Sequence, residues 1–260
     1  MFLIAPLLRA ECDRTSVETL LDDADAKCRL AGMDLLLTDS DWQSRSEIWS
    51  RLSAIARDDA RTDRERDAAV WTFLLAHRFA EIRDAACTIA ADHSRPMLAH
   101  RVAMAILENV EHDDRPSYVH SDIRALREEA AGMIAWGDEE AAKITFAVAT
   151  DDSEPPEIRG DAIRALGTRG RNEKELLELL DEQHWFFGAQ GQHFLVHSLA
   201  FVIFQLGYSD SPEVRARLES MRPELAKLPH DERGYVEWEL RMTLEHMKVT
   251  PDATAAATTY

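Results

Sequence analysis

The sequence predicts an all-α protein made of stacked antiparallel helix pairs. Apolar residues recur at spacings of three and four along almost the whole chain, whereas the alternation and β-branched clusters of strands are nearly absent. Helix-start signals are frequent, and both Thr15-x-x-Glu18 and Thr62-x-x-Glu65 fit the capping box. Together these patterns favour helix throughout.

The same signals locate the individual helices. They predict helices at 16–37, 41–57, 63–77, 80–92, 96–111, 121–136, 139–150, 155–167, 173–182, 191–206, 212–226 and 231–247. Pro155-Pro156 and Pro212 each place a proline in a first helical turn, while Gly167 and Gly207 suit left-handed caps at helix ends. No Pro/Gly/Ser-rich linker interrupts the pattern, so we expect a single domain over 1–248 and a disordered tail over 249–260.

Five segments share a small residue in the middle of a helix face, and the clearest is Arg159-Gly-Asp-Ala162-Ile-Arg-Ala165-Leu-Gly167. The small residues stand at positions 68, 103, 130, 162 and 200, at separations of 35, 27, 32 and 38. A small residue lets a neighbouring helix approach closely, while larger apolar residues three and four positions along fill the groove beside it. The pattern therefore indicates irregular repeats, with 1–60 and 208–247 as caps.

The segment Glu157-Ile-Arg159-Gly-Asp-Ala162-Ile-Arg-Ala165-Leu-Gly167 resembles the second helix of a HEAT repeat. The usual form of that helix begins with Asp/Glu-x-Val/Ile-Arg and continues with Ala and then Ala-Leu-Gly. With the looser copies the resemblance covers 62–207, although the copies at Ala103 and Ala200 lack the acidic start. It implies a HEAT-like α-solenoid and says nothing about activity.

The net charge of the chain favours some classes of binding partner over others. The chain has 48 acidic and 30 basic residues, a formal net charge of −18. Such a field repels phosphate backbones, so nucleic acid is disfavoured unless basic residues gather on one face, and a basic protein surface is the easier partner. The alternative is that the charge serves solubility alone.

Cysteine usage and hydropathy point to a soluble, cytoplasmic protein with no membrane association. Cys12, Cys28 and Cys87 are far apart and form no C-x-x-C pair, so we expect neither a disulfide framework nor a zinc ribbon. The apolar start lacks a basic region and is interrupted by Pro6. No apolar run approaches the ~20 residues of a membrane span.

Two features are candidate interaction surfaces. Acidic pairs recur at expected helix ends, where stacking would align them into rows that steer a basic partner. The candidate binding residues among them are Asp58, Asp59, Asp113, Asp114, Asp151 and Asp152. Aspartate is also an ordinary cap and turn residue, which explains the same pattern without a partner.

The second candidate surface is the run of three adjacent aromatic residues Trp185, Phe186 and Phe187, beside a glycine-containing loop. Three neighbours cannot all face one stripe of a helix, so at least one should be exposed as an interface anchor. A loop that folds back to close the end of a helix pair is the alternative.

The search for chemistry finds no catalytic motif, and we expect no metal and no cofactor. His193 and His197 have the i, i+4 spacing that lets two imidazoles share a metal ion, but a third ligand is missing. The segment 111–122 is rich in oxygen and nitrogen ligands, yet it also has the composition of a turn. HEAT-like deoxyhypusine hydroxylases bind iron with His-Glu dipeptides, and this sequence contains none.

The leading hypothesis is therefore a protein–protein interaction module, a scaffold, inhibitor or immunity-type binder, and not an enzyme. The alternative is a HEAT-like enzyme such as an alkylpurine-type DNA glycosylase, which would need a basic stripe. The arginines available for it are Arg124, Arg127, Arg159, Arg164, Arg169 and Arg171. A lyase or chaperone for a small cofactor is a third reading, and it requires an aromatic, apolar groove.

Overall fold

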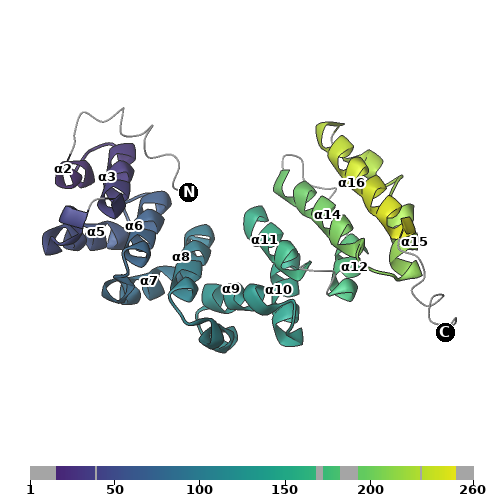
Figure 1. Ribbon diagram of the computed structural model, residues 1–260, viewed down its shortest axis with the longest axis horizontal. Coiled ribbons are helices and arrows are strands. Elements are labelled where there is room, and N and C mark those ends of the chain that lie inside the picture. Colours follow the sequence, from purple (N-terminus) through teal and green to yellow (C-terminus); the bar gives the residue numbers. More distant parts are fainter. Residues whose placement is uncertain (1–15, 39, 168–171, 182–192, 229, 250–260) are drawn as a thin grey trace, which may run out of the picture. The chain divides into compact units, whose positions relative to one another are not determined.

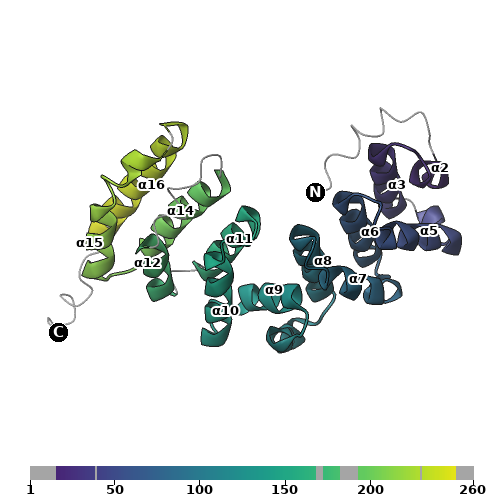
Figure 2. The same ribbon diagram turned by 180° about the vertical axis from the view of Figure 1, so that it is seen from behind.

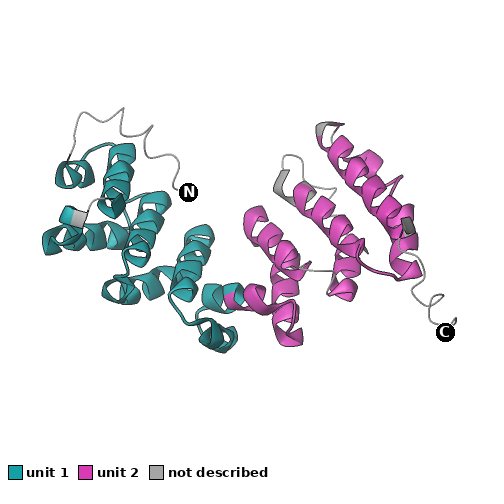
Figure 3. Ribbon diagram, viewed as in Figure 1, with its two compact units in different colours: residues 1–129 teal, residues 130–260 magenta. Residues whose placement is uncertain are grey.

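The computed structural model shows an all-helical chain, with no strand in the part that it describes. The described residues are 16–38, 40–167, 172–181, 193–228 and 230–249. Contacts divide the chain into two compact units, 1–129 and 130–260 (Figure 3). We describe each unit by itself.

The first unit consists of short helices that follow one another in pairs (Figure 1). They are α2 (Val17–Leu21), α3 (Ala26–Thr38), α4 (Ser40–Gln43), α5 (Ser46–Arg57), α6 (Asp63–Leu75), the 3-10 helix η1 (Phe79–Glu81), α7 (Arg83–Ala90), α8 (Pro96–Glu108), the 3-10 helix η2 (His112–His120) and α9 (Arg124–Ile134), which crosses the border between the units. Helix α5 packs on α6, and α7 packs on α8. Helix α6 also contacts both α3 and α8, so these second helices of the pairs lie side by side.

The second unit repeats this arrangement, as the view from behind also shows (Figure 2). Its helices are α10 (Glu139–Thr150), α11 (Pro156–Leu166), α12 (Glu173–Asp181), α14 (His193–Leu206), α15 (Pro212–Ser220), the 3-10 helix η4 (Leu225–Lys227) and α16 (His230–Val249). The pairs are α10 with α11, α12 with α14, and α15 with α16. Helix α14 contacts both α11 and α16, which makes it the middle of three second helices.

The five small residues singled out in the sequence all lie on helices and are buried. They are Ala68 on α6, Ala103 on α8, Ala130 on α9, Ala162 on α11 and Ala200 on α14. Their burial fits the reason given for them, because a small side chain at such a position brings two helix axes close together.

Helix starts follow the local signals at three places. Thr62 and Glu65 form the expected capping box at the start of α6. Pro156 opens α11, and Pro212 opens α15 behind a serine cap. Each device satisfies or removes a backbone N–H that has no partner within the helix.

The expected helix 16–37 is instead two helices, α2 and α3. Ser16 caps α2 and accepts a hydrogen bond from the next turn, whereas the expected cap, Thr15, lies outside the described residues. The carboxylate of Asp23 accepts the N–H of Asp25, and the carboxylate of Asp25 accepts the N–H of Lys27. These local bonds compete with helical hydrogen bonds and so break the helix.

The two glycines expected as left-handed caps have a different role, and that prediction is wrong. Neither has a positive φ, and Gly167 ends α11 at φ −75°. A Cβ on Gly167 would lie 2.5 Å from Cε1 of Phe201, and one on Gly207 would lie 2.6 Å from Cγ2 of Thr243. A side chain at either position would therefore force side chains of the next second helix to shift, which favours glycine at both.

The structure also bears on the expectations about membrane spans and cysteines. No helix in the described part of the chain is long and apolar enough to cross a membrane. Cys28 is disulfide-bonded, which the cysteine spacing did not predict, whereas Cys87 is a free thiol whose pKa is raised by burial. Cys12 lies outside the described residues.

Candidate functional site

Large exposed apolar side chains lie on or next to the second helices of the pairs. In the first unit these are Leu75 and Met104. In the second unit Trp136 follows α9, and five more lie on α14, directly after it, or on α16: Phe204, Tyr208, Tyr235, Trp238 and Met242, each between 43% and 56% exposed. Single exposed apolar residues are ordinary, but five on or beside two adjacent helices form a patch.

Helix α16 carries two apolar stripes. Val236, Leu240 and Leu244 are spaced by four and are buried. Tyr235, Trp238 and Met242 are spaced by three and four and remain exposed. An amphipathic helix needs one apolar stripe to pack on its neighbour, so the second stripe is not explained by the packing of this helix.

A cavity of about 340 Å³ lies between α14 and α16. We call it the aromatic groove and define it by its lining residues: Phe204, Gly207, Tyr208, Trp238, Glu239, Met242, Thr243 and His246. The rings of Phe204 and Tyr208 meet edge to face with centroids 5.4 Å apart, and Tyr208 stands 6.4 Å from His246 in a similar arrangement. The groove therefore presents aromatic faces and edges to a ligand.

Glu239 is the one carboxylate that lines the groove. Its surroundings bury it in part, and this burial raises the pKa of Glu239 above its usual value. Thr243 donates a hydrogen bond to it over 3.4 Å, and no cationic side chain among the described residues pairs with it. A partly dehydrated carboxylate without a counterion attracts a cationic group more strongly than a solvated carboxylate does.

A second cavity, of about 570 Å³, shares Trp238 with the groove. Its other lining residues are Arg222, Leu225, Gly234, Glu237, Leu240 and Arg241. Charges of both signs line it, and among its described lining residues Trp238 is the only aromatic one. The aromatic groove is therefore the better-defined site.

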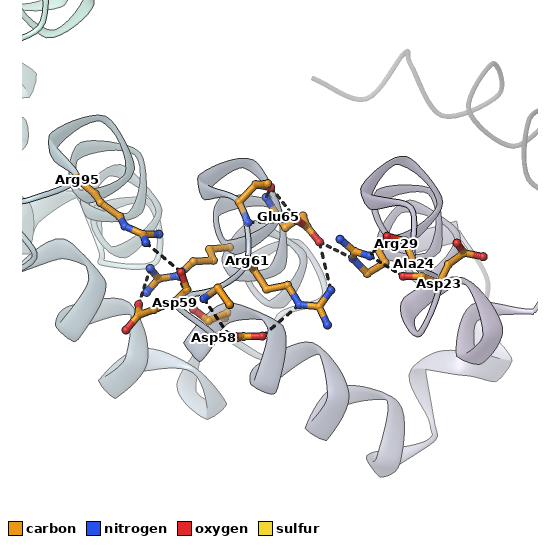
Figure 4. A network of polar contacts seen from close by, with 12 residues as sticks. Asp23, Ala24, Arg29, Asp58, Asp59, Arg61, Glu65 and Arg95 are labelled. Atoms are coloured by element: carbon orange, nitrogen blue, oxygen red, sulfur yellow. Dashed lines mark hydrogen bonds and ion pairs between the residues drawn. The ribbon is translucent and has the colours of Figure 1, made fainter.

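The acidic pair Asp58–Asp59 belongs to a polar network in the first unit (Figure 4). Asp58 accepts hydrogen bonds from the N–H of Ala60 and from Nε of Arg61. Asp59 pairs over 2.8 Å with Arg66, whose guanidinium is buried, and its backbone carbonyl accepts a hydrogen bond from Arg95. The pair therefore holds two helix pairs together, while the Asp59 side chain stays 82% exposed.

Asp151 and Asp152 make corresponding contacts in the second unit, a turn hydrogen bond and an ion pair with a buried arginine. Asp151 accepts the N–H of Ser153, and Asp152 pairs over 3.1 Å with the buried Arg159. Arg159 also donates Nε–H to the carbonyl of Ala149. Because the Asp152 side chain remains 72% exposed, these pairs are still available for contact, and their binding role stays a prediction.

The remaining predicted site residues are separate from the groove. Asp113 and Asp114 lie at the start of η2, where the expected turn is a 3-10 helix, and the Asp113 side chain is fully exposed beside His112. The aromatic run Trp185, Phe186 and Phe187 lies outside the described residues.

The groove itself was not predicted. Its sequence signal is the spacing of Tyr235, Trp238 and Met242, which resembles any core-facing stripe when α16 is read alone. The structure shows that α16 packs through the other stripe, Val236, Leu240 and Leu244, and leaves Tyr235, Trp238 and Met242 exposed.

The metal hypothesis receives no geometric support in the described part of the chain, where no group of three or more His, Cys, Asp or Glu side chains is placed to hold an ion. His197 is exposed and meets Tyr235 edge to face at 5.1 Å. The side chain of its expected partner, His193, lies outside the described set.

The arginines of the DNA-binding hypothesis are engaged within the protein. Arg124 pairs with Glu128, Arg127 donates to a backbone carbonyl, and Arg164 pairs with Asp161. Arg159 is buried, and both Arg169 and Arg171 lie outside the described residues.

His100 is a second notable site, in the first unit. Its Nδ1 is hydrogen-bonded to a carboxylate oxygen of Glu129 over 2.8 Å, and its Nε2 lies 3.2 Å from a carboxylate oxygen of Glu128, so the ring is held between two acidic side chains. Burial by itself lowers the pKa of His100, but the bonds to Glu128 and Glu129 outweigh it and raise the pKa to about 9. This contact connects α8 to α9 and leaves no free position for a ligand at the ring nitrogens.

Comparisons with protein families, with characterised proteins and with solved structures gave no match, so the function is argued from the site alone.

Proposed function

We propose that this chain is a HEAT-like α-solenoid that works as a protein–protein interaction module, a scaffold, inhibitor or immunity-type binder, and engages a basic protein surface. The observation that carries the proposal is the aromatic groove with Glu239 on α14 and α16. The chain is cytoplasmic under this proposal.

Recurring contacts support the solenoid part. Arg66 bonds the carbonyl of Ala56, ten residues before it, and pairs with Asp59, seven before it. Arg159 makes the same two contacts at the same two separations. Equal contacts at equal spacings are typical of repeated helix pairs, in which each unit packs on its neighbour.

The exposed stripe of α16 supports the binding part. Helix α16 exposes Tyr235, Trp238 and Met242 in addition to the stripe by which it packs. Tryptophan and tyrosine in a cavity are the residues that most often supply binding energy at protein interfaces.

Charge supports a basic partner. The chain has a formal net charge of −18, Glu239 has no cationic partner among the described residues, and the side chains of Asp59 and Asp152 are largely exposed. Such a field attracts a cationic surface and accelerates the encounter.

A small-molecule chaperone or lyase is the second candidate, because the groove has the aromatic, apolar lining that it requires. Native mass spectrometry of the purified protein separates the two. A small molecule retained at one copy per chain and released by Trp238→Ala would favour the second candidate.

Site-specific crosslinking tests the main proposal. Benzoylphenylalanine is placed at Tyr208, within the groove, and as a control at Glu213, which is exposed on α15. In a lysate of the organism that makes the protein, we expect a defined adduct with a basic protein at position 208 only, lost at high salt. Absence of a protein adduct, together with salt-dependent binding of duplex DNA, would overturn the proposal.

A further inference from the structure

We propose that the aromatic groove is a receptor for one guanidinium group, the arginine side chain of the basic partner. This inference rests on the proposed function and adds the chemical identity of the anchor. It follows from three observations: a carboxylate without a counterion, a chamber sized for one side chain, and a contact pattern that the protein uses elsewhere.

Glu239 supplies the charge. It is partly buried on the groove side of α16, and the hydrogen bond from Thr243 is long, at 3.4 Å. Arg241 and Arg222 line the other cavity, beyond Trp238, and neither pairs with Glu239. Because no cationic side chain among the described residues pairs with Glu239, a cationic ligand can supply its counterion.

The lining and the size select a side chain with an apolar stem. Phe204, Tyr208, Trp238 and Met242 surround a cavity of about 340 Å³, which is near the lower limit of ligand sites at ~300–1,000 Å³. A helix does not fit in such a space, whereas one long side chain does. Aromatic faces also attract cations, which makes a purely apolar ligand the poorer match.

Arginine fits better than lysine because its guanidinium is flat. Its face can stack on an aromatic ring while its edge donates to a carboxylate, whereas an ammonium is a compact and strongly hydrated charge. The ligand therefore satisfies the ring and Glu239 at the same time.

The protein already contains this arrangement in its own fold. The guanidinium of Arg78 lies 4.6 Å from the ring centre of Trp49 and forks onto Glu81 with bonds of 2.6 and 3.0 Å. Arg45 likewise lies 4.2 Å from the ring centre of Trp42 and pairs with Glu18. The groove presents the tryptophan and the glutamate of this triad, Trp238 and Glu239, without the arginine.

The test titrates N-acetyl-L-arginine amide into ¹⁵N-labelled full-length protein and follows the indole N–H signal of Trp238, assigned with Trp238→Phe. The matched neutral probe is N-acetyl-L-citrulline amide, which has nearly the same shape without the charge. We expect saturable binding of the arginine probe in the millimolar range, at least about fivefold tighter than the citrulline and lysine-amide probes.

Two variants locate the charge. Glu239→Gln should weaken the arginine probe at least about fivefold and leave the citrulline probe unchanged, whereas Glu237→Gln, on the next residue but one toward the other cavity, should change neither. Thermal unfolding checks that both variants fold. Equal binding of arginine and citrulline, equal binding of arginine and lysine, or insensitivity to Glu239→Gln would overturn the assignment.

This outcome is separable from that of the proposed function. If the crosslink at Tyr208 captures a protein but the arginine probe does not bind, the module stands and the guanidinium assignment fails. If the probe binds and no protein is captured, the receptor site stands and the protein-binding proposal fails.

Discussion

Arg66 donates its Nε–H to the backbone carbonyl of Ala56 over 3.0 Å, and this bond joins two helices of one pair. The guanidinium is 5% exposed and also pairs with Asp59. The polar contact therefore lies inside the helix pair, where water cannot replace it, and it gives the turn between α5 and α6 a fixed geometry.

Removal of this arginine should destabilise the protein. Arg66→Ala loses a charge-assisted hydrogen bond and an ion pair in a buried position, and we expect a loss of about 1.5–3 kcal/mol in the free energy of unfolding. Urea denaturation measures it. The exposed Arg64→Ala, on the same helix, should stay within about 0.5 kcal/mol, and an equal loss in both variants would show that the buried contact is not responsible.

The raised pKa of His100 predicts a decline in stability at alkaline pH. Its pKa is raised to about 9 in the folded protein, above the unfolded value near 6.5, so its stabilisation is complete below pH 6.5 and is lost as pH rises through 9. The total effect is on the order of 3 kcal/mol. The free energy of unfolding measured from pH 6 to 10 should show this decline, and His100→Gln should flatten it. An unchanged slope in the variant would assign the effect to other groups.

Gly207 is predicted to tolerate no side chain. Gly207→Ala would place a Cβ 2.6 Å from Cγ2 of Thr243 and should cost about 1–3 kcal/mol through overpacking. Adding Thr243→Ser removes that methyl group and should recover part of the loss. Gly234→Ala is the control, because its Cβ meets nothing within 4 Å and should stabilise α16 by about 0.5–1 kcal/mol. Thermal unfolding of the three variants distinguishes close packing from a general intolerance of substitution.

Trp238 is predicted to contribute more to partner binding than to the stability of the fold. Because it is 48% exposed, Trp238→Ala should change the free energy of unfolding by less than about 1 kcal/mol and reduce capture of the partner by tenfold or more. Trp136→Ala removes a tryptophan of similar exposure outside the groove and should leave capture unchanged. Quantified crosslinking at Tyr208 provides the measurement, and equal losses in both variants would contradict a specific role for the groove.

Glu239 also predicts that stability falls as pH rises, but here the cause is the ionisation of a partly buried acid. Burial raises the pKa of Glu239, so its ionisation opposes folding, and the associated stability is lost as pH rises through the folded pKa of this carboxyl. Glu239→Gln should therefore be at least as stable as the parent protein at pH 7 in urea denaturation. A destabilised variant would mean that the ionised carboxylate has a favourable internal partner.

The helices were largely predictable, because their signals act over one or two turns. The expected helix 139–150 coincides with α10, and the capping box of Thr62 and Glu65 starts α6 as predicted. The break between α2 and α3 was missed, since the carboxylate bonds of Asp23 and Asp25 compete with helix only when the backbone has already turned.

The sequence by itself determined an acidic, all-helical chain with buried small residues along its helices. Tertiary structure alone decided the role of Asp59, which pairs with a buried arginine, of Gly207, which makes room for Thr243, and of Trp238, which faces a cavity. The physical reason is the sequence separation of the residues that interact. Helix caps and apolar periodicity depend on neighbours within a turn. Burial, close approach and exposure depend on residues that are distant in sequence and that only folding brings together.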